Sequence, residues 1–291
     1  MAAVSIIIPV WNRAEYLPRL FRSLATVSYE ELEVVLVDNG STDGSLGLCR
    51  SFAESAPMVV TVLEEPRQGA CYARNCGLSY CKTEWVYFFD SDDELSPSFL
   101  NEVMPGVADA DLVVFPTNEQ VGGKVRQRRY CPSEKAAAQI LSSTLNTQGM
   151  LFRTIFLREI GGWDESLGIW QDWELGIRAL LHAPRVQWMG QKVYHRIYVH
   201  ADSITGASMT ERLTPIRHTL DVVAEELYAP RDQRALFFRY AIYDGLLRRE
   251  GSEPLDCTLS VGWAYRVAGA LLRNYTALGG RGAWRIALWL C

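Results

Sequence analysis

Ser5-Ile-Ile-Ile-Pro-Val-Trp-Asn12 is a short apolar run that ends in a polar loop. A wholly apolar run of this length is typical of a β-strand that is covered on both faces. Comparable runs recur further along the chain, at 33–37, 58–63, 85–89 and 111–115. Apolar residues at helical spacing between these runs predict helices at 17–24, at 70–80 and from about 96. The repeated strand–helix order predicts an α/β fold in which a mostly parallel central sheet is flanked by helices.

The composition changes twice beyond this alternating region. Residues 116–132 are polar and contain two adjacent glycines, which predicts a long loop or a hairpin. Helical patterning resumes at Ser133 and again at 171–181, and arginine-rich helical segments fill the chain beyond about residue 205. We therefore expect three consecutive parts, 1–115, 116–205 and a helical C-terminal extension at 206–291.

Length, composition and charge exclude several classes of protein. The chain has 291 residues, of which 48% are hydrophobic and 22% are charged, as in a globular protein with a sizeable core. The net charge of −5 excludes nucleic acid as the expected partner. No run of about 18 apolar residues occurs, and the apolar N-terminal stretch is too short for a signal peptide. We therefore expect a cytoplasmic protein whose seven cysteines are reduced thiols.

Polar side chains follow three of the predicted strands at the point where each strand ends. Pro9-Val10-Trp11-Asn12 follows the first strand, Asp38 the second and Asp90-Ser-Asp-Asp-Glu94 the fourth. The carboxyl ends of parallel strands meet at one edge of a sheet, which is where such sheets bind ligands. Adjacent carboxylates favour a divalent cation, and hard oxygen ligands suit Mg²⁺ or Mn²⁺. The alternative is a solvated acidic turn that caps the next helix.

Other ligand-binding motifs are missing from the sequence. Neither G-x-G-x-x-G after the first strand nor G-x-x-x-x-G-K-[ST] occurs, so a dinucleotide site or a P-loop is not expected. The four histidines form no H-E-x-x-H motif, and the evenly spaced Cys71, Cys76 and Cys81 do not match zinc-site spacings. The edge with the three polar strand ends is therefore the main candidate site.

Six motifs in a fixed order resemble the signature of a known enzyme family. They are Ser5-Ile-Ile-Ile-Pro-Val-Trp-Asn12, Val37-Asp-Asn-Gly-Ser-Thr-Asp43, Ala73-Arg-Asn75, Phe89-Asp-Ser-Asp-Asp93, Gly161-Gly-Trp-Asp-Glu-Ser166 and Gln171-Asp-Trp-Glu174. Together they resemble family-2 glycosyltransferases, which have the GT-A fold and invert the anomeric centre. The resemblance covers roughly residues 4–205. It implies that 1–115 binds the donor, and that 116–205 binds the acceptor and carries the catalytic base.

The resemblance also implies roles for individual residues. The nucleotide-sugar donor would be bound by Pro9, Val10, Asn12, Asp38, Arg74, Asp90 and Ser91. Asp92 and His200 would hold a divalent cation, Mn²⁺ or Mg²⁺, and Asp172 would be the general base. Gln171 departs from the family pattern, which has an acidic residue at this position. The candidate acceptor contacts are Trp170, Gln171 and Met150, whereas Trp163 is expected in the core.

The predicted helix at 171–181 places Asp172 on the same face as Leu175 and Ala179, which should turn toward the protein. Glu174 and Arg178 are four residues apart and should form a pair on the solvent side. A carboxylate at the start of a helix also stabilises it by capping. The sequence therefore leaves both a catalytic and a capping role open for Asp172.

The reaction implied by the resemblance moves a sugar from a nucleotide-diphosphate sugar, in many members a UDP-sugar, to a hydroxyl of a saccharide or lipid-linked saccharide, as in bacterial polysaccharide biosynthesis. The cation neutralises the leaving diphosphate while a carboxylate takes the proton of the attacking hydroxyl. A nucleotidyltransferase is an alternative, but the loop at 9–15 lacks the glycine-rich basic sequence such enzymes usually show. A nucleotide-binding module without turnover is a second alternative, which the combination of the Asp90 cluster and Asp172 disfavours.

The C-terminal extension has an uneven charge pattern. Its charged side chains after Cys257 are all arginines, namely Arg266, Arg273, Arg281 and Arg285, and they stand among tryptophans and aliphatic residues. Arginine and tryptophan on an amphipathic helix are typical of a segment that lies in a membrane interface. The alternatives are a helical cap on the catalytic domain and a dimer contact. Peripheral membrane binding, at the inner face of the membrane, and oligomerisation both stay open.

Overall fold

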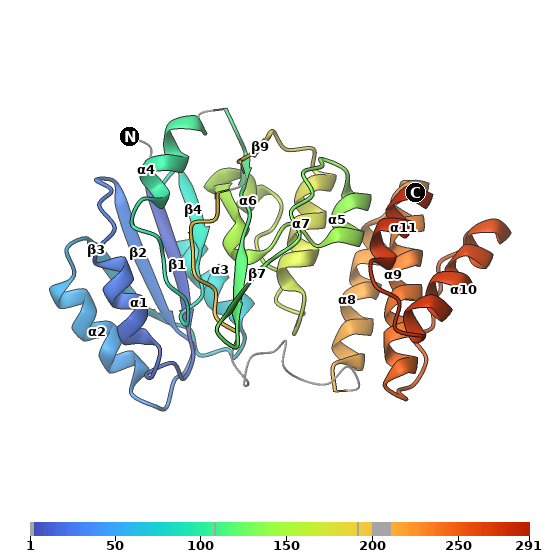
Figure 1. The fold of residues 1–291 in the computed structure, drawn as a ribbon. Coiled ribbons are helices and arrows are strands. Elements are labelled where there is room, and N and C mark those ends of the chain that lie inside the picture. The colour runs from blue at the N-terminus through green and yellow to red at the C-terminus, as the bar shows by residue number, and fades with distance from the viewer. Residues whose placement is uncertain (1–2, 108, 191, 200–210) are drawn as a thin grey trace. The chain divides into compact units, whose positions relative to one another are not determined.

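The computed structural model describes residues 3–107, 109–190, 192–199 and 211–291 (Figure 1). The chain divides into two compact units. The first unit comprises Met1–Tyr130, Leu145–Ser166 and Pro184–Val199, and the second comprises Cys131–Thr144, Leu167–Ala183 and His200–Cys291. The chain therefore passes between the units several times, whereas the sequence suggests three consecutive parts.

A seven-stranded sheet forms the centre of the first unit, in the spatial order β3-β2-β1-β4-β8-β5-β9. The strands are β1 (Val4–Val10), β2 (Leu32–Asp38), β3 (Val59–Glu64), β4 (Trp85–Phe88), β5 (Leu112–Val114), β8 (Met150–Arg153) and β9 (Val186–Trp188). β1 lies parallel to β2 and β4, β2 to β3, and β5 to β9, while β8 is antiparallel to both of its neighbours. The mostly parallel sheet is thus confirmed.

Helices cover both faces of this sheet, which explains why its central strands are apolar throughout (Figure 1). The helical elements of the first unit are α1 (Leu17–Leu24), α2 (Ser45–Ser55), α3 (Ala70–Tyr80), α4 (Phe99–Val103), α6 (Thr154–Glu159) and the 3₁₀ turns η1 (Met104–Gly106) and η2 (Thr147–Gly149). Ile6 and Ile8 of β1 belong to the core that contains Leu17 of α1. Ile7 instead faces α3, so closely that a Cβ on Gly77 would lie 2.5 Å from Ile7 Cγ2. Successive side chains of a strand point to opposite faces, so both sets are apolar here.

Strand β8 is not predicted by the sequence. Its four residues lie between β4 and β5 in the sheet, so that these two parallel strands do not pair directly. Leu151 of β8 pairs with Tyr87 on one side and with Val113 on the other. Only three consecutive apolar residues mark this strand, between η2 and the arginine that precedes α6, so the sequence shows no apolar run of strand length here.

The polar stretch after β5 forms a hairpin of β6 (Asn118–Val121) and β7 (Lys124–Gln127), one of the two forms that the sequence allows. Gly122 and Gly123 connect these strands with φ angles of +54° and +77°. A two-residue turn that matches the twist of the strands requires this left-handed conformation, which glycine adopts most readily.

The second unit is helical. Its helices are α5 (Ala136–Ser142), α7 (Gln171–Leu181), α8 (Leu213–Glu226), α9 (Pro230–Arg249), α10 (Trp263–Ala277) and α11 (Ala283–Leu290). The predicted helix at 171–181 and the helical C-terminal extension are both confirmed. Trp173 of α7 is buried and donates through Nε1 to the C=O of Ile140 in α5, at 3.2 Å. Among the described helices, none combines the length and the apolar character that are needed to cross a bilayer.

Candidate active site

The loop after β1 is fastened to the loop after β2. The register pairs Val10 with Asp38, so the two strands end side by side. Asn12 has a φ of +51°, and its Oδ1 accepts a hydrogen bond from the N–H of Thr42 at 2.8 Å. Its own N–H donates to Ser41 Oγ at 3.0 Å. Asparagine tolerates the left-handed conformation better than most residues, so Asn12 both permits and fixes the shape of this loop.

Asp38 is buried, and one of its carboxylate oxygens is unpaired. Oδ2 accepts hydrogen bonds from the backbone N–H groups of Gly40 and Ser41, at 3.2 and 3.1 Å. Oδ1 is buried without a hydrogen-bond partner in the part of the chain that the structure describes. Leaving a buried polar atom unpaired costs about 1–3 kcal/mol. A ligand with an N–H group would therefore be stabilised at this oxygen.

Asn39 links the end of β2 to the loop before α3, a role that the sequence does not reveal. Its Nδ2 donates to the C=O groups of Glu65 and Arg67, at 2.9 and 2.7 Å. Its Oδ1 accepts from the N–H of Gly69 at 2.8 Å. The side chain is buried and uses both ends of its amide, so it shapes the wall beside Asp38.

Asp90 is held by a buried arginine. Arg74 of α3 donates through Nη2 to Asp90 Oδ1 at 3.1 Å. The same guanidinium lies over the ring of Trp163, 4.4 Å from its centroid. Trp163 is 2% exposed and packs edge-on against Phe88, which confirms its place in the core. The packing of Arg74 therefore fixes the position of Asp90.

Asp92 lies beside the basic residues of the β1–α1 region. Its Oδ2 is 4.0 Å from Nη2 of Arg13, and its backbone C=O accepts a hydrogen bond from Arg19. The Asp92 side chain is 18% exposed, whereas the preceding Ser91 is buried. Asp92 thus presents a partly exposed carboxylate beside two guanidinium groups.

Asp93 is the buried member of the acidic cluster, and it is hydrogen-bonded to two other segments of the first unit. Its Oδ1 accepts from the N–H of Tyr198 at 2.7 Å, and its Oδ2 accepts from Nε2 of Gln148. Burial raises the pKa of Asp93 to about 9, and the neighbouring charges of Asp92 and Asp90 add to this effect. Both oxygens are occupied by protein donors, so Asp93 joins the cluster to η2 and to the segment at 192–199.

The residues of this edge suit a cation that is shared with a bound ligand. Within residues 3–107, 109–190, 192–199 and 211–291, no three His, Cys, Asp or Glu side chains are grouped so that they could hold a metal ion. Mg²⁺ is usually bound by one or two carboxylates together with phosphate oxygens of a substrate. Asp90 and Asp92 are partly exposed and offer such a pair. His200, the other predicted ligand, lies outside the described residues.

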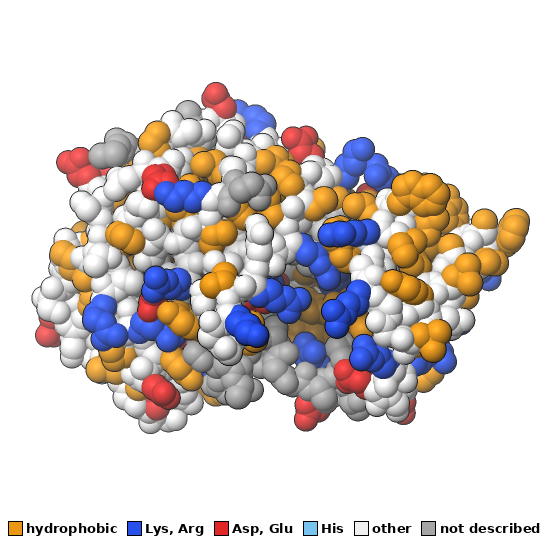
Figure 2. Space-filling model, in the orientation of Figure 1, with side chains coloured by type: hydrophobic (Ala, Val, Ile, Leu, Met, Phe, Trp, Pro, Cys, Tyr) orange, Lys and Arg blue, Asp and Glu red, His pale blue; other side chains and the backbone are white. Residues whose placement is uncertain are grey.

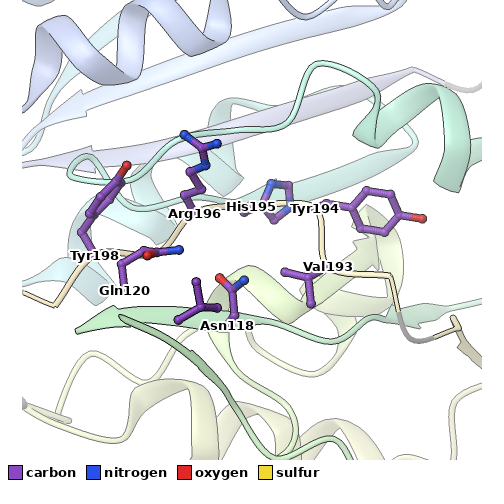
Figure 3. A pocket seen from close by; sticks show the side chains of 8 residues that line it. Asn118, Gln120, Val193, Tyr194, His195, Arg196 and Tyr198 are labelled. Atoms are coloured by element: carbon purple, nitrogen blue, oxygen red, sulfur yellow. The ribbon is translucent and has the colours of Figure 1, made fainter. Parts of the chain in front are cut away.

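A pocket of about 520 Å³ adjoins the acidic cluster at Tyr198. Figure 3 shows Asn118 and Gln120 of β6 facing the segment at 193–198, with Tyr198 at one end. Arg19 lies over the ring of Tyr198, 3.8 Å from its centroid. His195 also lines the pocket, and burial lowers its pKa to about 3. Amide and aromatic side chains therefore line a hollow that is linked to Asp93 through Tyr198.

Asp172 stands at the start of α7 in the second unit. Trp170 precedes the helix with a φ of +54°, and Asp172 Oδ1 accepts a hydrogen bond from the N–H of Trp173 at 2.9 Å. Asp172 is partly exposed. The side chain thus bonds to the first turn of the helix while part of it faces solvent, so a capping and a catalytic role are both compatible with its geometry.

The pair of Glu174 and Arg178 differs from the prediction. Glu174 is fully buried, and it accepts from Nε and Nη2 of Arg178 at 2.6 and 2.9 Å. Glu226 of α8 lies 3.8 Å from the same guanidinium. Helix α8 packs against α7, so this side of α7 faces a neighbouring helix instead of solvent. The four-residue spacing of Glu174 and Arg178 predicts that they pair, but it gives no information about α8, which covers the pair.

Arg239 of α9 is buried next to the start of α7 and is missed by sequence reasoning. Its Nη1 donates to the C=O of Ile140 and to Ser143 Oγ, at 3.0 and 2.9 Å. The guanidinium lies within 5 Å of three ring centroids, those of Trp170, Trp173 and Tyr243. Burial lowers the pKa of Arg239, and the charge of Asp172 partly offsets this shift. Arg239 thus connects the C-terminal extension to the surroundings of Asp172.

The three predicted acceptor contacts lie in different surroundings. Trp170 packs edge-on against Tyr243, with centroids 4.6 Å apart, and stays partly exposed. Gln171 donates through Nε2 to the C=O of Leu167 at 2.9 Å. Met150 opens strand β8 in the first unit and is 1% exposed, so little of it is available to a sugar.

More than half of the chain matches the model of one protein family. The family is described as glycosyl transferase family 2, and the match spans residues 5–160. The chain belongs to this family. Asp38, Arg74 and the acidic cluster at Asp90 lie inside the part that matches family 2, whereas Asp172 lies beyond it.

Two relatives of this family-2 chain have names that refer to teichoic acid biosynthesis or to poly(ribitol-phosphate). Minor teichoic acid biosynthesis protein GgaA of Bacillus subtilis is 30% identical over 224 residues, which cover 70% of this chain and 49% of that protein. Poly(ribitol-phosphate) beta-N-acetylglucosaminyltransferase TarS of Staphylococcus aureus is 26% identical over 202 residues, covering 67% of this chain and 35% of TarS. The chain spans about half the length, or less, of the curated relatives it matches.

Solved structures share the family-2 fold. S. aureus TarS 1-349 in complex with UDP-GlcNAc aligns with a TM-score of 0.66 at 18% identity, over 99% of this chain and 90% of that chain. Mannosyltransferase PcManGT from Pyrobaculum calidifontis, in complex with GDP-Man and Mn²⁺, aligns with a TM-score of 0.63 at 19% identity, over 98% of this chain and 78% of that chain. This likeness confirms the GT-A type fold that the motifs imply.

Proposed function

We propose that this family-2 member is an inverting glycosyltransferase of the cytoplasm that uses a nucleotide-diphosphate sugar, specifically a UDP-sugar, as its donor. The observation that carries this proposal is the buried, unpaired Oδ1 of Asp38 at the edge where β1 and β2 end. The N–H group of a uracil base would satisfy this oxygen. The UDP-GlcNAc in the structure of TarS, a relative of similar fold, supports a donor of this class.

Residues around Asp38 are assigned to the rest of the donor. Pro9, Val10 and Asn12 form the loop that would lie along the nucleotide, and the hydrogen bonds of Asn12 keep that loop in one shape. Arg74 binds one oxygen of the Asp90 carboxylate, and the Asp90 side chain is 34% exposed. Part of this carboxylate is therefore open to a ribose hydroxyl. Ser91, which is buried next to Asp90, is also assigned to the donor.

We assign Asp92, with Asp90 beside it, to a divalent cation, Mn²⁺ or Mg²⁺. When bound, such a cation would neutralise the charge that grows on the leaving diphosphate. Arg13, 4.0 Å from the Asp92 carboxylate, would add a second positive charge at the same place. His200 is a further proposed ligand whose surroundings are outside the described residues.

Asp172 is assigned the role of general base. In the proposed single displacement, the oxygen of the acceptor hydroxyl bonds to the anomeric carbon while the bond from that carbon to the diphosphate oxygen breaks. The electron pair of the broken bond leaves with the diphosphate, and the hydroxyl proton passes to Asp172. Arg239 and Trp173 would position the start of α7. Trp170 and Gln171 adjoin Asp172 and are assigned to the acceptor, a saccharide or lipid-linked saccharide.

Product release tests this function directly. The full chain is incubated with soluble saccharides and, in separate samples, with nucleotide sugars or nucleoside triphosphates. Each sample is run with and without Mn²⁺, and the released nucleotide or pyrophosphate is identified. We expect release of UDP that depends on the cation and is accelerated by an acceptor. Release of pyrophosphate from a nucleoside triphosphate would indicate nucleotidyl transfer instead. Binding of UDP without turnover of any donor would indicate a binding module.

A further inference from the structure

Helix α10 presents a row of exposed apolar side chains to solvent. The row, called here the α10 apolar face, repeats every three or four residues and comprises Trp263, Val267, Leu271, Tyr275 and Leu278. Trp263 is 80% exposed and Leu278, which follows the last turn, is 90% exposed. Apolar side chains this exposed and this regularly spaced indicate a binding surface, since scattered surface residues would show no such order.

The opposite face of α10 is packed tightly on α9, which fixes the direction of the α10 apolar face. A Cβ on Gly245 of α9 would lie 2.4 Å from the backbone oxygen of Arg273, so the two helices are in backbone contact there. Asp244 of α9 also forms an ion pair with Arg273, at 3.7 Å. Rotating α10 to bury its apolar face would break both contacts. The face is therefore a fixed outward feature of the second unit.

The charged side chains of α10, of α11 and of the turn between them are all arginines. Arg266, Arg281 and Arg285 are exposed, and no Asp or Glu follows Asp256 in the sequence. On α11, Trp289 is 84% exposed. Figure 2 shows hydrophobic side chains gathered over α10 and α11, with basic side chains near them. An apolar stripe with tryptophan, on helices whose charged side chains are arginines, matches an anionic lipid surface in both polarity and charge.

We propose that the α10 apolar face, with the arginines beside it, lies in the interface of a bilayer that contains anionic phospholipid. Trp263 and Leu271 enter the boundary between headgroups and acyl chains, and Arg266 and Arg285 contact lipid phosphates. A second copy of the chain is the less suitable partner, because two such faces would bring arginines together without any carboxylate from the same segment. This inference deepens the proposed function, since a lipid-linked acceptor would be concentrated at the same surface.

Vesicle flotation tests this inference on the full chain. Vesicles of phosphatidylcholine alone are compared with vesicles that also contain phosphatidylglycerol. The apolar variant is Trp263→Ser with Leu271→Gln, and the charge variant is Arg266→Gln with Arg285→Gln. Tyr228→Ser serves as the matched control, because Tyr228 is 86% exposed and lies outside α10 and α11.

We expect the wild-type chain and the Tyr228 control to float with the anionic vesicles. The apolar variant should lose at least about tenfold in partitioning, and the charge variant roughly fivefold for each arginine. Wild-type protein that stays with neither vesicle, or binds both equally, would overturn the proposal. A dimer in light scattering that the apolar variant dissociates would assign the face to a second copy. UDP affinity is measured on the same samples. A chain that binds UDP but no vesicle contradicts only the membrane inference, whereas a chain that does not bind UDP contradicts the proposed function.

Discussion

The edge of the first unit where β1, β2 and β4 end and the outer face of α10 hold their side chains in opposite ways. At the edge, polar groups are fixed by the protein itself: Asn12 by the β2 loop, Asp90 by Arg74 and Asp93 by Tyr198. On α10, side chains such as Trp263 stand largely free in solvent. Fixed groups suit a small polar ligand that must adopt one geometry, whereas an exposed apolar face suits a fluid surface that has none. Substitutions at the edge should therefore change chemistry, and substitutions on α10 should change only location.

The largest expected effect is the loss of transfer when Asp92 at the edge is replaced, and its absence would contradict the comparison. We expect Asp92→Ala to abolish transfer at an unchanged melting temperature, because the lost carboxylate is proposed to hold a cation worth several kcal/mol of transition-state stabilisation. Turnover is measured with Mn²⁺ and again in excess chelator. Glu54→Ala, an exposed carboxylate on α2, is the control and should retain activity. Full activity of Asp92→Ala, or undiminished turnover in chelator, would contradict the cation-assisted mechanism.

The base candidate in the second unit sharpens the comparison, since it should act on turnover alone. Asn caps a helix about as well as Asp, but an amide does not accept a proton at neutral pH. We therefore expect Asp172→Asn to keep its melting temperature and UDP affinity and to lose about 10²–10⁴-fold in turnover. Near-normal turnover would place the base elsewhere. Asp164 would then be the next candidate, because Glu174 is buried against Arg178.

Asp38 should show the reverse pattern, with an effect on donor binding. We expect Asp38→Ala to weaken UDP binding by about 1.5–3 kcal/mol, the usual value of a hydrogen bond to a charged group. Asp38→Asn separates the ligand contact from loop support, because its amide oxygen can still accept from Gly40 and Ser41. Calorimetry gives both affinities. If UDP binds both variants as tightly as the wild-type chain, Asp38 does not contact the base.

The last effect concerns stability instead of transfer, and it lies in the core behind the edge. Burial lowers the pKa of His195 from 6.5 to about 3, so the folded chain keeps this imidazole neutral while the unfolded chain binds a proton below pH 6.5. Stability should therefore fall as the pH drops from about 6.5 toward about 3, by up to about 1.4 kcal/mol per pH unit. His195→Phe, which suits the neighbouring Phe99 and Phe115, should reduce this slope in denaturant titrations.

The parallel strands β1 to β5 could be predicted because each of them lies in an apolar run of the sequence. The apolar runs that contain Ile7, Val35 and Phe88 are covered on both faces, and the structure places them in adjacent strands. Strands β8 and β9 could not be predicted in this way, because neither lies in a longer apolar run: the apolar residues of β8 end at Arg153, and Gln187 interrupts β9. Their pairing depends on partners that are distant in sequence.

The same distinction between local and distant signals applies to the residues of the candidate site. Asp38, Asp90 and Asp92 each follow a strand that the sequence predicts, so their common edge could be expected. The supporting contacts could not, because they join residues far apart in the chain, as Arg239 does when it packs on Trp173. Motif spacing indicates which residues meet a ligand, while the side chains that hold them come from the tertiary structure.

The insertion of β8 between β4 and β5 has a consequence for synthesis on the ribosome. Strands β1 to β5 are all complete before residues 150–153 are made, yet β4 and β5 are not joined in one sheet until β8 pairs with both. During that interval the nascent chain carries an apolar strand with an open edge, which is a template for pairing with other chains. Closing such a long-range contact is slow. A fragment that stops after β5 should therefore aggregate instead of folding as an independent donor-binding domain.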